Sequence, residues 1–234
     1  VFAGGGHSQF DVAFDAQTTE VTSGFGGIYA RQDWDTHWLR AVVTGGFANH
    51  ESDRRVANGG GGAVETASAD YDGYFIAPAL TAGARLGEVA PDHALWGSVR
   101  VHYAGMFLDG YTESGAGNPL TVDDRDIHIL GGRAQLAAPY EQLGADGAVF
   151  RFEGRIGVDA QFNVGDSGVE TTVAGLPLNF TATFDDEIVS GFVGGSLART
   201  SEDGSGFFKA STEVHFASDG SYELRGNLNA VWNF

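Results

Sequence analysis

The fold class is decided by the C-terminal stretch YELRGNLNAVWNF, residues 222–234. Apolar or small residues occupy every second position from Tyr222 to Phe234, and polar residues lie between them, with Val231 as the exception. Alternation with a period of two places the two sets of side chains on opposite faces of a β-strand. A long strand with one apolar and one polar face is typical of a strand that lies between lipid and water.

The same alternation recurs over residues 150–164, where Phe152 and Ile156 face one way and Arg151 and Arg155 face the other. Soluble strands average about 5–6 residues, and these runs are longer. The pattern predicts strands near residues 1–14, 21–32, 37–50, 71–87, 94–110, 125–141, 148–164, 187–200, 206–218 and 221–234. We therefore expect an all-β fold, a transmembrane antiparallel up-and-down β-barrel with about ten strands in this chain.

The connections between these strands differ in length between the two ends of the predicted barrel. With Phe234 on the periplasmic side, alternation assigns one set of connections to the outside and one set to the inside. The outside loops are predicted near 15–20, 51–70, 111–124, 165–186 and 219–220, and the inside turns near 33–36, 88–93, 142–147 and 201–205. Three outside loops are long and every inside turn is short, as in bacterial outer-membrane barrels.

Composition excludes several classes of function. A formal net charge of −18 argues against nucleic-acid binding, which needs basic residues to displace counterions. The absence of cysteine excludes a disulfide scaffold, a thiol nucleophile and a Cys-ligated metal. The histidines show no metal-ligand spacing, and we interpret the glycines at 59–62 as an external loop. We expect no cofactor and no metal. No run of about 18 apolar residues predicts a membrane helix, and no secretory signal opens the chain.

Two internal motifs resemble the autotransporter β-domain family. The first is LDGYTESGA at residues 108–116, followed by LTV at 120–122 and by Arg125. The second is RFEGR at residues 151–155, which leads to Gln161-Phe162. Members of the family often have a His-Glu-Phe run where this chain has Ala-Gln-Phe, so the second match is looser.

The C-terminus carries the third resemblance. A final Phe234, with Trp232 two residues before it and small or apolar residues at further alternate positions, resembles the signal that the outer-membrane barrel-assembly machinery reads. A strand edge with an apolar face and free backbone groups can pair with another sheet edge. This motif is shared by outer-membrane barrels in general.

The resemblance implies an outer-membrane translocator that anchors an upstream passenger and assists its export to the cell surface. Its expected partners are outer-membrane lipid, the barrel-assembly machinery and its own passenger. Family barrels have twelve strands preceded by a pore helix. We therefore interpret residues 1–234 as one barrel domain that lacks the helix and the first two strands. Charged residues of the polar faces are predicted to line the lumen, namely Arg151, Glu153, Arg155, Glu223 and Arg225.

Other functions are open from the residues alone. A barrel without a passenger, either a porin-like channel or an adhesin, is the first alternative, and an outer-membrane hydrolase is the next. The interior acids that an enzyme would need are Glu153, Asp159 and Glu213, which we instead expect to pair with Arg151, Arg155 and Lys209. The pair Asp126 and His128 lies two residues apart and so faces one side of a strand, but it lacks the wider motifs of an outer-membrane protease. We expect no enzyme activity.

Overall fold

The computed structural model describes residues 1–12, 16–57, 64–91, 93–165, 168–173, 176–181 and 187–232. Its strands are β1 (Phe2–Val12), β2 (Gln17–Asp33), β3 (His37–Ala57), β4 (Val64–Ala90), β5 (His93–Leu108), β6 (Tyr111–Thr112), β7 (Leu120–Val122), β8 (Arg125–Leu143), β9 (Val149–Asn163), β10 (Gly168–Val173), β11 (Leu176–Thr181), β12 (Glu187–Thr200), β13 (Gly206–Ala217) and β14 (Tyr222–Trp232). No helix within these ranges is long and apolar enough to cross a membrane.

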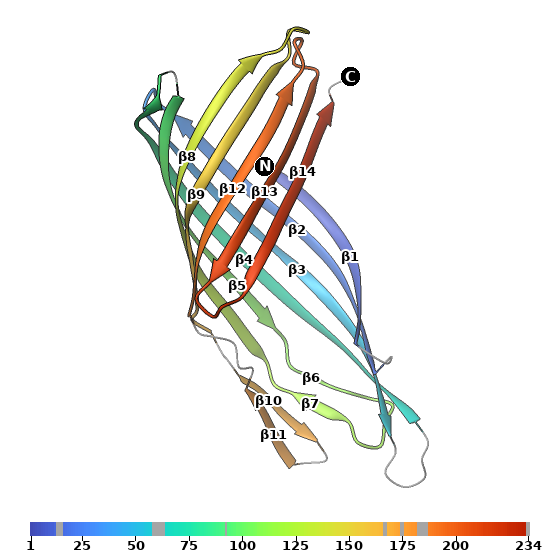
Figure 1. Cartoon of the computed structure of the whole chain (residues 1–234). Helices are drawn as coiled ribbons and strands as arrows, with labels where there is room; N and C mark the ends of the chain where they lie inside the picture. Colours follow the sequence, from blue (N-terminus) through green and yellow to red (C-terminus); the bar gives the residue numbers. More distant parts are fainter. Residues whose placement is uncertain are drawn as a thin grey trace.

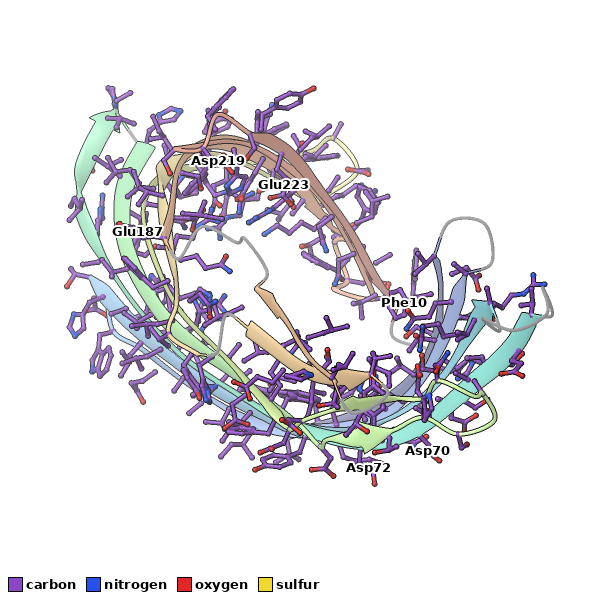
Figure 2. All side chains as sticks on the ribbon, turned by 90° about the horizontal axis from the view of Figure 1, so that it is seen from below. Phe10, Asp70, Asp72, Glu187, Asp219 and Glu223 are labelled. Atoms are coloured by element: carbon purple, nitrogen blue, oxygen red, sulfur yellow. The ribbon has the colours of Figure 1, made fainter. Side chains whose placement is uncertain are left out.

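Ten long strands form one antiparallel sheet, in the order β1-β2-β3-β4-β5-β8-β9-β12-β13-β14. Each long strand lies beside the long strands before and after it in the chain, so the predicted up-and-down topology is confirmed. The sheet is curled around a central space, and β1 faces β14 across a gap (Figures 1 and 2). Within the described residues, β1 pairs only with β2 and β14 only with β13, so the sheet keeps two free edges.

The register assigns the two faces of the sheet. Phe152 lies opposite Tyr140 on β8 and Leu197 on β12, and all three side chains project from the convex face. Their neighbours along β9, Arg151 and Glu153, project from the concave face. From β3 to β14 the convex face is apolar and strongly exposed, whereas on β1 and β2 the large apolar side chains Phe2, Phe10, Phe25 and Tyr29 share the concave face with Arg31. An apolar outer surface of this kind fits lipid rather than water.

Aromatic side chains on the convex face form two levels. On β9 the levels are marked by Phe152 and Phe162, and on β14 by Trp232 and Tyr222. Each pair is ten positions apart, which is about 34 Å along a strand. At a strand tilt of about 40°, this separation is about 26 Å along the membrane normal, close to the apolar band of about 25 Å in outer-membrane barrels. Between the levels, β9 and β14 carry only aliphatic residues and one glycine each on this face, which suits a hydrocarbon layer.

The long connections all lie at one end of the sheet, together with the short hairpin between β13 and β14, and the opposite end carries only short turns, as predicted (Figure 1). Gly204 and Gly220 adopt left-handed φ angles of 71° and 83°, which the tight hairpins at these positions require. In the first turn, hydrogen bonds from Ser201 and Ser205 lower the pKa of Asp203 to about 2, so that carboxylate stays charged and holds the turn closed.

The loop predicted over residues 51–70 is wrong in extent. β3 continues to Ala57 and β4 begins at Val64, and residues 51–57 pair with 64–70 in register. Here Asp53 and Arg55 lie on one face of the pair, and the other face buries the small residues Ser52, Ala67 and Ala69, so neither face carries the large apolar side chains of the membrane segments. An expectation based on apolar alternation therefore ends these strands where the apolar face ends. The glycines at 59–62 lie outside the described residues.

Two predicted loops contain short strands. Residues 111–124 hold β6 and β7, and residues 165–186 hold β10 and β11, which together form a four-stranded sheet in the order β11-β10-β7-β6. A bridge between Ser68 and Ser114 joins this small sheet to the protruding end of β4. Viewed along the lumen, β10 and β11 project over its mouth (Figure 2).

A buried ion pair also holds the small sheet. Arg54 on β3 donates hydrogen bonds of 2.9 and 2.6 Å to the carboxylate of Glu113, whose residue is 7% exposed. Burial alone raises the pKa of Glu113, but the hydrogen bonds from Arg54 and from the backbone N–H of Leu120 outweigh burial and hold the pKa below its usual value. This contact fixes the segment between β6 and β7 against the barrel end.

Candidate functional site: the polar lumen wall

The concave face of the sheet encloses a cavity of about 1340 Å³. Three of the residues predicted for the lumen, Arg151, Glu153 and Arg155, line it. The other two, Glu223 and Arg225, project from the same face of β14 but lie outside this cavity and pair with each other at 2.6 Å. Figure 2 labels Glu223 on the inner side of the curled sheet. The five residues therefore share one face but do not form one cluster.

A charged network on the concave face is centred on Glu213 of β13. Arg133 of β8 donates hydrogen bonds of 3.1 and 2.8 Å to the two carboxylate oxygens of Glu213, and Arg155 lies 3.4 Å from the same carboxylate. Asp159 lies 3.6 Å from Arg133 and 3.3 Å from His215. A bidentate Arg–carboxylate contact fixes orientation as well as distance, so this network holds β8, β9 and β13 in one relative position.

Aromatic side chains pack against this network. Phe192 of β12 is 3% exposed, with the guanidinium of Arg133 3.7 Å from the centre of its ring. His215, also 3% exposed, stacks on Phe192 with a ring distance of 5.2 Å. The network is therefore packed into the wall and does not hang freely in the lumen. Partial removal from water strengthens its ion pairs relative to those on an open surface.

A second group of charges lies nearer the turns. Arg151 is 3.5 Å from Glu141 and 3.6 Å from Glu153, and Glu153 is 3.7 Å from Arg155. The expectation that interior acids pair with interior arginines is confirmed for these residues. It is wrong for Lys209, which has no carboxylate within 4.0 Å in the part of the chain that the structure describes. Lys209 lines the cavity.

Sequence reasoning missed Arg133 and Phe192. Both lie at concave positions of alternating strands, Arg133 between Gly131 and Gln135 on β8 and Phe192 between Ser190 and Gly194 on β12. Arg133 could have been found from its position in the alternation of β8, which places it on the polar face. Its partner Glu213 is 80 positions away in the sequence, and only the sheet register shows that the two meet.

The pair Asp126 and His128 projects from the convex face near the long connections. Their nearest atoms are 4.0 Å apart, and the Nδ1 atom of His128 shares a 2.6 Å hydrogen bond with the hydroxyl of Tyr103. Phe107 packs edge-on against the same imidazole. The pair therefore faces away from the cavity. Within the described residues, no group of three or more His, Cys, Asp or Glu is arranged to hold a metal ion.

Of the two predicted C-terminal signal residues, the structure describes only Trp232. Trp232 projects from the convex face of the edge strand β14 and is 64% exposed. Phe234 lies outside the described residues. Both therefore remain predicted signal residues.

The comparison with known families agrees with this architecture. The family model described as "Autotransporter beta-domain" matches residues 1–227 of the 234 residues. No curated protein matches the chain. The matched region contains the ten long strands, the charged concave wall and the apolar convex belt except for the final residues of β14. The chain therefore belongs to the autotransporter β-domain family, the outer-membrane translocator barrels of type V secretion.

Proposed function

We propose that this barrel anchors a passenger polypeptide in the bacterial outer membrane and assists its export through the lumen. One observation supports the proposal above others. From β3 to β14, a single antiparallel sheet presents an apolar belt of membrane thickness on its convex face and a charged, water-accessible wall on its concave face. Such a sheet satisfies its own backbone groups in lipid while it offers a polar path to an extended chain. The proposal assigns the wall a role in transport and none in catalysis.

The proposal includes closure of the sheet. The free edges of β1 and β14 would leave backbone groups unpaired in hydrocarbon, each at a cost of several kcal/mol. We propose that two further strands of the same polypeptide bridge these edges, in keeping with twelve-stranded barrels of the family. In this arrangement the convex belt of β3 to β14 contacts outer-membrane lipid, and β14 is the strand that the barrel-assembly machinery recognises.

Closure is tested by comparing two forms of the protein. The full-length polypeptide should refold in detergent into a form that migrates faster on gels before heating than after heating. A chain that begins at Val1 should not give this compact form, because its edges cannot pair. A compact, heat-modifiable form from the chain that begins at Val1 would show that the ten strands close without help.

Export is tested by surface display. In the full-length protein, the passenger is replaced by an epitope, and antibody binding is measured on intact cells. We expect binding with the intact barrel and its loss when a stop codon precedes Tyr222 and removes β14. Epitope display without β14, or a heat-modifiable barrel in the membrane that never displays the epitope, would contradict the export function.

A further inference from the structure

The basic residues of this acidic protein are concentrated in the cavity. The chain has 13 Lys and Arg against 31 Asp and Glu. Of these, seven basic but only four acidic residues line the cavity. The basic set is Arg31, Arg40, Arg100, Arg133, Arg151, Arg155 and Lys209. The lumen wall is therefore net positive in a protein whose overall charge is −18.

Four of these cations lie in one row across the sheet, which we call the arginine row (Arg31, Arg40, Arg100 and Arg133). Hydrogen-bonded register places Arg31 of β2 opposite Arg40 of β3, and Arg100 of β5 opposite Arg133 of β8. Thr81 of β4 lies between the two pairs, opposite both Arg40 and Arg100. All five residues line the cavity.

The row brings like charges directly opposite each other twice. Like charges at such positions destabilise a sheet, so folding alone gives no reason for this arrangement. Carboxylates compensate the two outer members, because Arg31 pairs with Asp33 and Arg133 pairs with Glu213. The two inner members are not compensated in this way.

Arg40 and Arg100 have no carboxylate within 4.0 Å among the described residues, and both are exposed to the cavity. Arg40 stands over the ring of Trp38 at 4.2 Å, which restricts its position. Adjacent strands are about 4.8 Å apart, so the backbones that carry Arg40 and Arg100 are about 10 Å apart. A carboxylate above Thr81 would lie between two guanidinium groups and beside a hydroxyl that can donate a hydrogen bond.

We propose that the arginine row is an anion-binding surface of the lumen, which takes the carboxylate side chains of an acidic polypeptide segment at Arg40, Thr81 and Arg100. This inference rests on the proposed translocator function and specifies the charge of the chain that the lumen holds. It follows from charge complementarity, because the wall supplies two uncompensated guanidinium groups and a hydroxyl at one register. A basic segment at the same place would meet repulsion from both arginines.

The test uses the full-length protein in planar lipid bilayers. In a KCl gradient, the reversal potential gives the ratio of chloride to potassium permeability. The variant Arg40→Gln/Arg100→Glu removes two positive charges and adds one negative charge, which lowers the net charge of the cavity by three. The introduced carboxylate would face Arg133, so the sheet should remain stable. We expect a ratio above one for the unmodified protein and a fall to about one in the variant, since the net charge of the cavity becomes neutral. The matched control is Arg55→Gln, a change of charge on the convex face beyond the aromatic level.

A second arm distinguishes the source of the anion. Oligoglutamate should block the current of the unmodified protein and block the double variant much less, whereas oligolysine of equal length should block neither. Chloride preference without a block by oligoglutamate would assign the row to small anions and overturn the polypeptide assignment. An unchanged permeability ratio in the double variant, or an equal change in Arg55→Gln, would overturn the anion-binding surface itself. Failure of the unmodified full-length protein to form a heat-modifiable barrel would instead reject the translocator function and this inference together.

Discussion

A charge placed at mid-membrane height on the convex face should destabilise the barrel far more than the same charge on the concave face. Ile156 is the position of choice because its side chain is 60% exposed and its cross-strand neighbours, Leu136 and Val193, are aliphatic. It lies four positions from Phe152 and six from Phe162 on β9. At about 3.4 Å per residue and a tilt of about 40°, Ile156 is roughly 10 and 16 Å from the two aromatic levels.

The expected cost follows from this depth. An arginine near the middle of the hydrocarbon layer costs about 2–4 kcal/mol in outer-membrane barrels, and one near an interface costs about 0–1 kcal/mol. Measured against the alanine variant at the same position, so that the lost apolar side chain cancels, Ile156→Arg should lower the free energy of unfolding by about 2–4 kcal/mol and Phe152→Arg by about 0–1 kcal/mol. Urea unfolding of the full-length barrel in lipid vesicles measures both values, with heat-modifiable gel migration as a second readout.

The matched control introduces the same residue on the opposite face. Ser196 lines the cavity and lies opposite Glu153, so Ser196→Arg gains a carboxylate partner and stays in contact with water. We expect its unfolding free energy to change by less than about 1 kcal/mol. Equal losses from Ile156→Arg and Ser196→Arg would refute the assignment of lipid and lumen to the two faces. Equal losses from Ile156→Arg and Phe152→Arg would refute the positions of the aromatic levels.

Three further predictions concern the two ends of the barrel. Because the chain has no cysteine, Asn118→Cys should react with an impermeant thiol reagent on intact cells and Glu202→Cys only after lysis, and the opposite result would invert the topology. The pKa of Glu113 is depressed, so its contribution to stability is present at neutral pH and is lost as the pH falls through the folded-state pKa, below 4.5. Protection of residues 111–122 against hydrogen exchange should therefore fall in acid, and Glu113→Gln should make this protection low at every pH. Deleting Phe234 should impair membrane insertion in cells while the purified barrel refolds almost normally, since one aromatic contact is worth only about 1.5–3 kcal/mol; normal insertion in cells would reject its role as an assembly signal.

The sequence by itself determined the long strands within the membrane and, on strands such as β9, the face on which each side chain lies. The alternation alone assigns Phe152 and Ile156 to the lipid side and Arg151 and Arg155 to the opposite side. This success has a local cause. A strand between lipid and water must alternate apolar and polar residues along its own length, so its orientation is written in consecutive positions. The lengths of the connections can also be read from the sequence alone, and they predict which end of the barrel carries the long loops.

Beyond the membrane the strands no longer alternate apolar and polar residues, so their extent cannot be predicted from this pattern. Residues 51–57 and 64–70 extend β3 and β4 into water, where neither face needs to be apolar. The small sheet that contains β7 and β10 joins segments from two different connections. Its pairing depends on long-range backbone hydrogen bonds rather than on a periodic pattern, so the sequence did not predict it.

Only the tertiary structure decided which charges meet. Alternation placed Glu213 and Glu153 on the inner face, but it could not say that Glu213 meets Arg133 across 80 positions or that Lys209 meets no carboxylate within the described residues. It also could not align Arg40 with Arg100 across Thr81. These contacts are set by the lateral register between strands, which the backbone hydrogen bonds and the curl of the whole sheet fix together. A strand specifies its own two faces, whereas its neighbours specify the height at which each side chain stands.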